Sequence, residues 1–320
     1  MLPRCHGAYL VPERYGRRVR ALVIGGIGVD VNVPLEARQW PLDLTADTVF
    51  TSGIELGAGH AGSGVALQAA ALGLDVTVVD AIGSDLWGEY LQELFPARGV
   101  RLDCVDHPAG TRRSVNLVRA DGTRLSLHDP RHPYDWTPDA RLWRDHLGEV
   151  AWVHAVIVSW ARQGLRDAVA AGVLTSTDLQ DWDGVSEHHR EFAELADVVF
   201  CSGAKLGGRR DAVVADVFAH GRVTTVVVTL GADGALVYGR GTEPVPVPAV
   251  RLPTLEITDT NGAGDAFCAT FMTALVGGTP TAQAADQAAV AAAFACAFPG
   301  TNTRLVTRAE LDALLRPDGA

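Results

Sequence analysis

The sequence predicts an α/β protein in three layers: a doubly wound, mostly parallel sheet with helices on both faces, accompanied by a small β-lid. Short runs rich in β-branched residues alternate with alanine-rich stretches of helical period, which is typical of parallel strands joined by crossover helices. With 48% hydrophobic and 20% charged residues among 320, the chain has enough apolar material for a large core. Two hairpin-like stretches interrupt the alternation and predict the lid.

The strands and helices of the main sheet follow one another in the order that crossover connections require. The expected strands are Arg20–Ile24, Val76–Asp80, Ala151–Val158, Val173–Thr177, Val198–Cys201 and Thr224–Thr229. The expected helices between them include Ser63–Leu72, Leu86–Ala97, Arg162–Ala171 and Arg209–His220. The last third adds a hairpin over residues 234–250 and two alanine-rich helices that begin near Gly262 and Thr281.

The predicted lid consists of segments 31–56 and 112–128, the second with an Asp121-Gly122 turn between two strand-like runs. A lid of this kind excludes water from a group transfer, because water would otherwise accept the transferred group. Residues 1–18 mix Pro, Arg and Glu without an apolar core, and we expect them to form an N-terminal extension before a single domain over 19–320.

The charge and the cysteines exclude several functional classes. A net charge of -11 lacks the basic footprint of a general nucleic-acid binder. The five cysteines are scattered and odd in number, which speaks against a disulfide framework and indicates a reducing cytoplasm. No stretch reaches roughly 18 uncharged apolar residues, so no membrane span is expected.

The most informative segment is residues 259–267, Asp-Thr-Asn-Gly-Ala-Gly-Asp-Ala-Phe, which leads directly into an apolar helical pattern. Gly262, Ala263 and Gly264 let the backbone approach a ligand, and their free amides at a helix N-terminus form an anion site suited to a transferring phosphoryl group. Asp265 would then act as base and positioner for an acceptor hydroxyl. We expect the helix dipole to keep Asp265 ionised and therefore a weak base. The alternative is a tight helix start with no catalytic role.

Together with other landmarks, this segment resembles the C-terminal signature of the ribokinase-like PfkB carbohydrate kinases. Val23–Asp30 resembles the family's opening strand and turn, Val226–Gly234 its nucleotide-side strand and turn, and Phe298–Thr301 its late loop. The landmarks keep the family's order from about Val19 to Arg304. The resemblance implies ATP and Mg²⁺ as cofactors, often K⁺, a small-molecule acceptor, and frequently a homodimer built through the lids.

The resemblance also implies roles for individual residues. The acceptor side comprises Asp30, which holds substrate hydroxyls in the family, with Gly28, Gly59, His60, Ser63 and Trp160. The nucleotide side comprises Ser202, Lys205, Thr229, Gly231, Gly234, Asn261 and Gly300. Asp259 is the candidate for a monovalent-cation site.

The acceptor side departs from the family pattern in two places. The family carries Asn two residues before the aspartate, where this chain has Gly28, and an Asn after its Gly-Gly pair, where this chain has Ser63 or Gly64 depending on the register. The missing amides leave room for a bulkier or differently decorated substrate. His60 offers a new contact to a hydroxyl or anion, or else only caps the helix. Trp160 stacks on a substrate ring or serves as packing.

The nucleotide side departs where the family has an Asn-x-x-Glu element, because this chain has Ser202 and Lys205 in its place. Lys205 either neutralises phosphate charge or is a solvated surface residue. Arg112, Arg113, Arg119 and Arg124 on the lid either reach an acidic or phosphorylated substrate or form a solvated strand face.

The combined pattern predicts an ATP-dependent kinase that phosphorylates a hydroxyl of a sugar-like molecule. A nucleoside kinase of the same fold is the alternative, since the missing amides and Trp160 suit a base as well. A non-catalytic regulatory member is a third possibility, motivated by the altered residues at positions 63, 64, 202 and 205.

Overall fold

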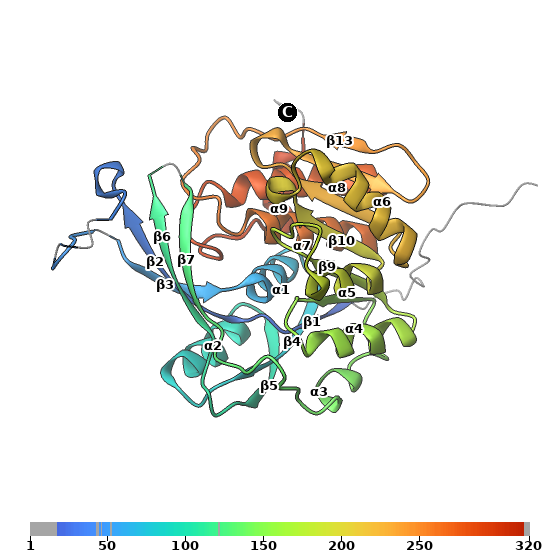
Figure 1. The fold of residues 1–320 in the computed structure, drawn as a ribbon, viewed down its shortest axis with the longest axis horizontal. Helices are drawn as coiled ribbons and strands as arrows, with labels where there is room; N and C mark the ends of the chain where they lie inside the picture. Colours follow the sequence, from blue (N-terminus) through green and yellow to red (C-terminus); the bar gives the residue numbers. More distant parts are fainter. Residues whose placement is uncertain (1–17, 43–44, 46, 52, 121, 317–320) are drawn as a thin grey trace, which may run out of the picture.

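The computed structural model describes residues 18–42, 45, 47–51, 53–120 and 122–316. Within these residues the main sheet has nine strands in the order β13-β12-β11-β10-β9-β8-β1-β4-β5 (Figure 1). Neighbouring strands from β5 to β11 pair in parallel, whereas β12 runs antiparallel to both of its neighbours. The strands are β1 (Arg20–Ile24), β4 (Asp75–Ile82), β5 (Val100–Asp106), β8 (Trp152–Ala155), β9 (Leu174–Asp178), β10 (Val198–Ser202), β11 (Thr225–Thr229), β12 (Ala235–Gly239) and β13 (Val245–Val247).

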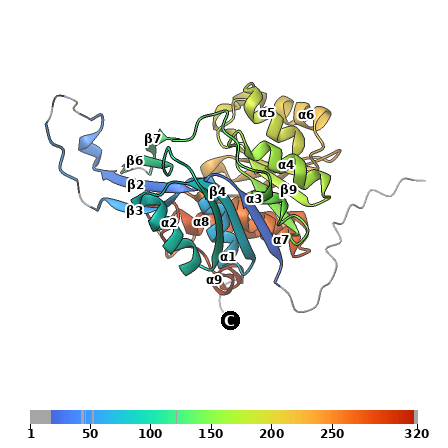
Figure 2. The ribbon, with the colours of Figure 1, turned by 90° about the horizontal axis from the view of Figure 1, so that it is seen from below.

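Helices cover both faces of this sheet (Figure 2). One face packs against α1 (Ala61–Ala71), α2 (Leu86–Ala97), α7 (Ala263–Val276) and α8 (Thr281–Ala295), with α9 (Arg308–Leu314) behind α8. The other face packs against α3 (Arg141–Arg144), α4 (Ala161–Ala170), α5 (Glu187–Leu195) and α6 (Arg210–His220). Because both faces are covered, the central strands are apolar and β-branched rather than alternating. The predicted three-layer fold is confirmed.

The β-lid is a second sheet of four strands in the order β3-β2-β6-β7 within the described residues. It comprises β2 (Gly28–Leu35), β3 (Glu55–Gly59), β6 (Arg113–Arg119) and β7 (Arg124–Asp129). In its registers Asn32 pairs with Asn116 and Asn116 with Ser126, whereas Val31 pairs with Val115 and Val115 with Leu127. Since side chains alternate across a strand, one lid face is polar and the other apolar.

Most predicted elements lie within two residues of their observed bounds. The predicted strand Ala151–Val158 is too long, because the chain leaves the sheet after Ala155 and turns at residues 156–158, where the Val158 amide donates to the Val156 carbonyl. Position 121 of the predicted lid turn and the predicted extension through residue 17 lie outside the described residues. The described cysteines, which exclude Cys5, are all free, and no described helix has the length and apolarity to cross a membrane.

The parallel strands bring one set of chain ends to a single edge of the sheet. Gly26 follows β1, Val156 follows β8, and Asp178, Ser202 and Thr229 end β9, β10 and β11. In open α/β sheets this edge is where ligands bind. The polar face of the lid lies over it.

Candidate active site

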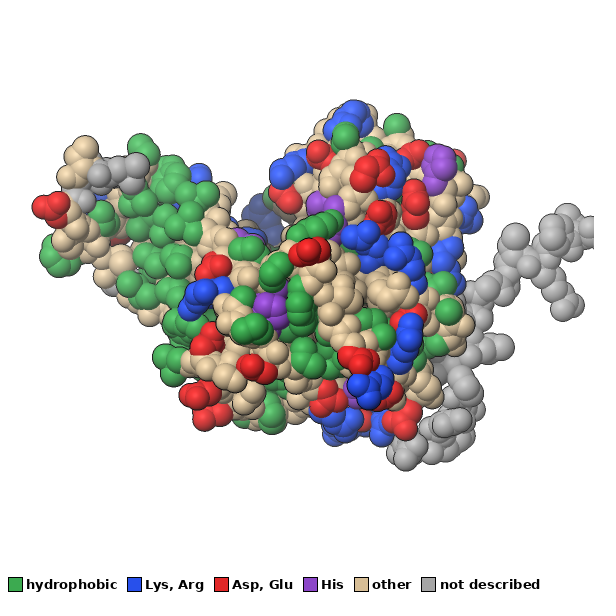
Figure 3. All heavy atoms as spheres, turned by 60° about the horizontal axis from the view of Figure 1, so that its bottom comes forward, with side chains coloured by type: hydrophobic (Ala, Val, Ile, Leu, Met, Phe, Trp, Pro, Cys, Tyr) green, Lys and Arg blue, Asp and Glu red, His purple; other side chains and the backbone are tan. Residues whose placement is uncertain are grey.

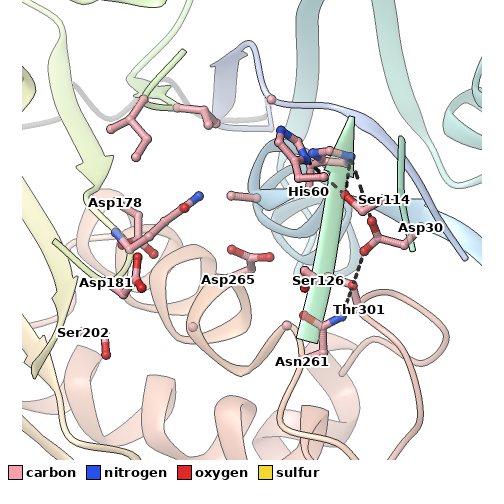
Figure 4. A pocket seen from close by; sticks show the side chains of 18 of the residues that line it. Asp30, His60, Ser114, Ser126, Asp178, Asp181, Ser202, Asn261, Asp265 and Thr301 are labelled. Atoms are coloured by element: carbon pink, nitrogen blue, oxygen red, sulfur yellow. Dashed lines mark hydrogen bonds and ion pairs between the residues drawn. The ribbon is translucent and has the colours of Figure 1, made fainter. Parts of the chain in front are cut away.

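A cavity of about 800 Å³ lies between the carboxyl ends of the strands and the polar face of the lid. Asp30, Asp178, Asp181 and Asp265 line it, and Figure 4 shows Asp265 between Asp178 and Asp30. A second cavity of about 750 Å³ adjoins the first. The two share Ser202, Thr229, Thr260 and Gly264 in their walls, so a molecule in one cavity can reach a molecule in the other.

The turn before α7 has the geometry of an anion site. Gly262 adopts the left-handed conformation, with φ 80°, at the N-cap of α7, a conformation that most side chains disfavour. Within the described chain, no group accepts a hydrogen bond from the amides of Gly264 and Asp265. Free amides at a helix N-terminus stabilise an anion. The predicted anion site therefore has the donors it requires.

The pKa of Asp265 is shifted in the direction opposite to the one that the sequence predicted. Burial raises the pKa of its carboxyl well above the ordinary range, and the negative charge of Asp178 adds to this rise. The helix dipole was expected to favour the ionised form and make Asp265 a weak base, whereas burial shifts its pKa in the opposite direction. A raised pKa makes Asp265 a stronger base for a hydroxyl proton.

Asp259 holds the turn against the late loop. One carboxylate oxygen accepts from the Asn261 amide at 2.9 Å, and the other accepts from the Gly300 amide at 2.9 Å. Its side chain is buried and lines neither cavity. Asp259 therefore connects the turn before α7 to the late loop by two hydrogen bonds.

Asp30 is connected through Thr301 to the turn before α7, residues 259–264, which is called the anion turn from here on. The Asn261 side-chain amide donates to Thr301 Oγ1 at 2.8 Å, and Thr301 Oγ1 donates to Asp30 Oδ2 at 3.0 Å (Figure 4). Burial raises the pKa of Asp30, while hydrogen bonds from Thr301 and Asn116 act against that rise. A Cβ on Gly59 would lie 2.0 Å from the Asp30 carboxyl carbon, so glycine is required there. This network fixes the acceptor side relative to the anion site.

His60 fills the space that Gly28 leaves. A Cβ on Gly28 would lie 2.5 Å from the His60 ring, so the sequence-based inference that this glycine leaves room for a bulkier substrate is wrong. His60 makes no capping hydrogen bond and lines the cavity, with Nε2 at 3.9 Å from Asp30 Oδ1 and 3.4 Å from Ser114 Oγ. Burial lowers the pKa of His60 to about 3, with His128 and Arg112 contributing.

We expect His60→Ala to raise the KM for the acceptor by about tenfold, since one hydrogen bond of roughly 1.4 kcal/mol is worth that factor. The KM for ATP should stay unchanged. Because the pKa of His60 is lowered to about 3, His60 is neutral throughout the range from pH 8 to pH 6. The wild-type acceptor KM should therefore not change as pH falls across this range. Steady-state kinetics across this range checks both points. A KM that follows a titration near pH 6.5 would show that His60 gains a proton.

The polar face of the lid contributes residues that the sequence analysis did not single out. Ser114, Asn116, Ser126 and His128 all line the cavity. Ser114 Oγ lies 3.1 Å from His128 Nδ1, and Ser126 Oγ donates to Asn116 Oδ1 at 2.7 Å. The signal was present, because polar residues stand at every second position at Ser114 and Asn116 in β6 and at Arg124, Ser126 and His128 in β7. Such a surface offers donors and acceptors to several hydroxyls.

Two carboxylates on the nucleotide side were also missed. Asp178 ends β9 and Asp181 follows three residues later, and both line the cavity. Lys205 Nζ lies 2.6 Å from an Asp181 carboxylate oxygen. A carboxylate that ends a buried parallel strand is a recognisable sequence signal.

Several predicted site residues do not face the first cavity. Trp160 is 4% exposed and belongs to the core, stacked on Trp143 at 5.9 Å between ring centroids. Of the two roles expected for Trp160, stacking on a substrate ring or packing, the structure shows packing in the core. Ser63, a residue of α1, is fully buried, and Lys205 and Gly300 line neither cavity.

Other predicted nucleotide-side residues do come together. Ser202, Thr229, Gly231 and Gly234 line the second cavity, whose remaining wall is mostly apolar and comes from residues 249–257, α7 and α8. Asn261, Gly262 and Gly264 line the first. An apolar slot beside an anion site suits a nucleotide base and its phosphates.

Comparisons with known proteins agree with this geometry. Residues 30–308 match the pfkB family carbohydrate kinases. The chain is 35% identical over 297 residues to an acarbose 7(IV)-phosphotransferase from Actinoplanes sp., covering 92% of this chain and 97% of the relative. It is 44% identical to the microbiome-derived acarbose kinase Mak1, with a TM-score of 0.88 over 93% of this chain and 99% of that structure.

A ribokinase from Arabidopsis thaliana, solved with ribose and ATP, shares the fold at 21% identity, with a TM-score of 0.79 over 94% of this chain and 99% of that one. The family match covers most of the chain, and Asp265, Asp30 and the anion turn meet in one cavity. The chain therefore belongs to the pfkB family of carbohydrate kinases, and it is an enzyme that transfers a phosphoryl group from ATP to a sugar hydroxyl.

Proposed function

We propose that the acceptor is acarbose or a molecule like it. Two similar proteins, at 35% and 44% identity, are named for acarbose, and they align over nearly their whole length. The lid face over the cavity is lined by hydroxyl, amide and imidazole groups, which suits a sugar with many hydroxyls. The nucleoside alternative loses one of its two supports, because Trp160 lies in the core.

The juxtaposition of Asp265 with the free amides at the start of α7 supports phosphoryl transfer to this acceptor. The acceptor hydroxyl lies between Asp30, which fixes it, and Asp265, which takes its proton. The bond between the γ-phosphorus and the β,γ-bridging oxygen breaks as the bond to the acceptor oxygen forms, and ADP leaves with the bonding electrons. The Gly264 and Asp265 amides stabilise the charge on the transferring group.

The residues fit Mg²⁺ as the metal of the reaction. Among the described residues no group of three or more His, Cys, Asp or Glu side chains forms a metal site. Mg²⁺ is commonly held by one or two carboxylates together with substrate phosphates and water. Asp178 and Asp181 supply carboxylates on the nucleotide side. The ion would supply positive charge at the phosphates when bound.

We also propose K⁺ activation through Asp259, whose buried carboxylate is an oxygen ligand close to the late loop. Replacing KCl by N-methylglucamine chloride should lower turnover. Unchanged turnover would leave Asp259 with the loop contact alone.

Lys205→Ala should raise the apparent KM for ATP by a few-fold. The Lys205–Asp181 pair is exposed, and such pairs contribute only about 0 to 1 kcal/mol, so a larger change is not expected. Initial rates at varied ATP and fixed Mg²⁺ measure the effect. An unchanged KM would assign Lys205 to the solvated surface.

The test of the proposed function is ADP release with ATP and Mg²⁺ against acarbose, ribose, fructose and adenosine. Turnover with acarbose that exceeds turnover with the other acceptors supports the proposal. Preference for adenosine would favour the nucleoside alternative. No release with any acceptor, with ATP binding intact, would favour the regulatory alternative.

We propose a homodimer through the apolar face of the lid. Leu56, Leu125 and Leu127 are 46%, 44% and 57% exposed there, and Figure 3 shows hydrophobic side chains gathered on the lid. Exposed apolar patches of this kind mark interaction sites. Analytical ultracentrifugation of Leu127→Asp should show a monomer where the wild type is a dimer, and a wild-type monomer would contradict the proposal.

A further inference from the structure

The tip of the lid hairpin rests on the anion turn. Thr260 Oγ1 donates to the Gly122 carbonyl at 3.2 Å, and a Cβ on Gly122 would lie 3.7 Å from the Thr260 amide nitrogen. Gly122 is in the turn between β6 and β7, whereas Thr260 is two residues before Gly262. The lid and the anion turn are therefore in contact in this structure. This contact places the start of β7 near the anion turn.

Arg124 is the first residue of β7 and lies two residues from this contact. In the β6–β7 register it pairs with Val118, and it has the same parity as Ser126 and His128, which belong to the polar lid face. It lines the cavity together with Asn261, Gly264 and Asp265. Arg124 is thus on the face that meets the anion turn.

Two arginine side chains line this cavity among the described residues, and one of them already forms an ion pair within the protein. Arg112 is buried, and its guanidinium lies 2.8 Å from both carboxylate oxygens of Asp80. Arg124 is exposed and has neither an ion pair nor a side-chain hydrogen bond within the described chain. It is therefore available to a ligand.

The surroundings of Arg124 are acidic. Asp30, Asp178 and Asp265 line the same cavity, and an incoming nucleotide adds phosphate charge. Burial raises the pKa values of Asp30 and Asp265, and the charge of Arg124 acts against the rise in each case. The positive charge of Arg124 therefore influences both Asp30 on the acceptor side and Asp265, the base.

We propose that Arg124 is a catalytic residue that the lid carries to the γ-phosphoryl group during transfer. The proposal rests on the kinase function given above. As the bond to the leaving ADP oxygen breaks and the bond to the acceptor oxygen forms, charge spreads over three equatorial phosphoryl oxygens. A guanidinium presents its donors as a planar fork that matches two such oxygens. The free amides of the anion turn supply further donors to the same group.

The rival role is recognition of an anionic group on the acceptor. A residue that contacts the transferring group lowers kcat when removed, because the interaction exists mainly in the transition state. A residue that binds the acceptor raises the acceptor KM and leaves kcat nearly unchanged. The two roles therefore differ in which kinetic constant changes.

The experiment compares Arg124→Ala and Arg124→Lys with a matched control, Arg113→Ala. Arg113 is a lid arginine at the other end of the β6–β7 hairpin, pairs with Asp129 at 3.3 Å and does not line the cavity. Arginine contacts of this kind are worth about 10³- to 10⁵-fold in kcat, so we expect Arg124→Ala to lose at least about 10²-fold at saturating substrates, with both KM values within about threefold. Arg124→Lys should recover only part of the loss, added guanidinium should restore part of it in Arg124→Ala, and the control should match the wild type. An unchanged kcat, or an effect confined to the acceptor KM, would overturn the proposal.

A second measurement needs no acceptor. Titration calorimetry compares the affinity for ADP and Mg²⁺ with and without aluminium fluoride, which mimics the transferring group. The wild type should bind ADP more tightly with fluoride, and Arg124→Ala should lose most of this gain while binding ADP alone as before. If Arg124→Ala keeps the gain, Arg124 is not a catalytic residue, even where the choice of acceptor proves wrong.

Discussion

Asp265→Asn is expected to lower kcat by about 10² to 10⁴-fold, which is the usual contribution of a positioned general base. The amide cannot take the hydroxyl proton, yet it has nearly the same volume and preserves the packing at the start of α7. The KM for ATP should change little, because the free amides of the anion turn remain. Initial rates with saturating ATP and acceptor measure the loss. Asp312→Asn on α9, at a residue that lines neither cavity, is the control and should keep wild-type turnover.

The same variant should be more stable than the wild type at neutral pH. Burial raises the folded-state pKa of Asp265, so the stability of this group is greatest at low pH and is lost as pH rises through the folded pKa. At pH 7 the wild type has therefore lost stability that the uncharged asparagine keeps. Thermal melts without ligand should show a higher Tm for Asp265→Asn at pH 7 and little difference near pH 3. Equal Tm values at pH 7 would contradict the pKa direction, and retained turnover would remove Asp265 from its role.

The sequence was most informative where the determinants of structure are local. The helix Leu86–Ala97 was predicted with its observed bounds, because Asp85 caps it by accepting from the Gly88 amide and Gly99 follows its end. The edge strand β5 was missed because its residues alternate poorly and are mostly half-buried. The helix α5 was missed because only Phe192 and Ala193 are buried on it.

The site divides in the same way. The anion turn and Asp265 could be predicted because one short segment contains the glycines, the helix start and the carboxylate. The bond between Thr301 and Asp30 joins residues 271 positions apart, and no local pattern indicates it. The same holds for Gly28 and the His60 ring, where a missing side chain was interpreted as free space although another residue fills it.

Gly64→Ala is the second substitution with a large expected effect. A Cβ at position 64 would lie 2.2 Å from Asp265 Oδ2 and 2.6 Å from its Cβ, and real contacts of this kind are not so short. The backbone at position 64 is fixed, since Gly64 donates to the His60 carbonyl at 3.2 Å and α1 packs against α7. The Asp265 side chain must therefore move. A misplacement of about 1 Å can cost on the order of 10² in rate, so we expect a kcat loss of that size.

Two comparisons show whether this loss acts through Asp265. Gly148→Ala is the matched control, since a Cβ there meets no atom within 4 Å and the variant should keep wild-type turnover. If Gly64 acts by making room for the base, Gly64→Ala added to Asp265→Asn should lower kcat little further, because residues that act as a unit are non-additive. Independent losses that multiply would mean that the new methyl group acts through α1. A loss that acts through Asp265 would mean that position 64 must lack a side chain to leave space for the carboxylate of Asp265.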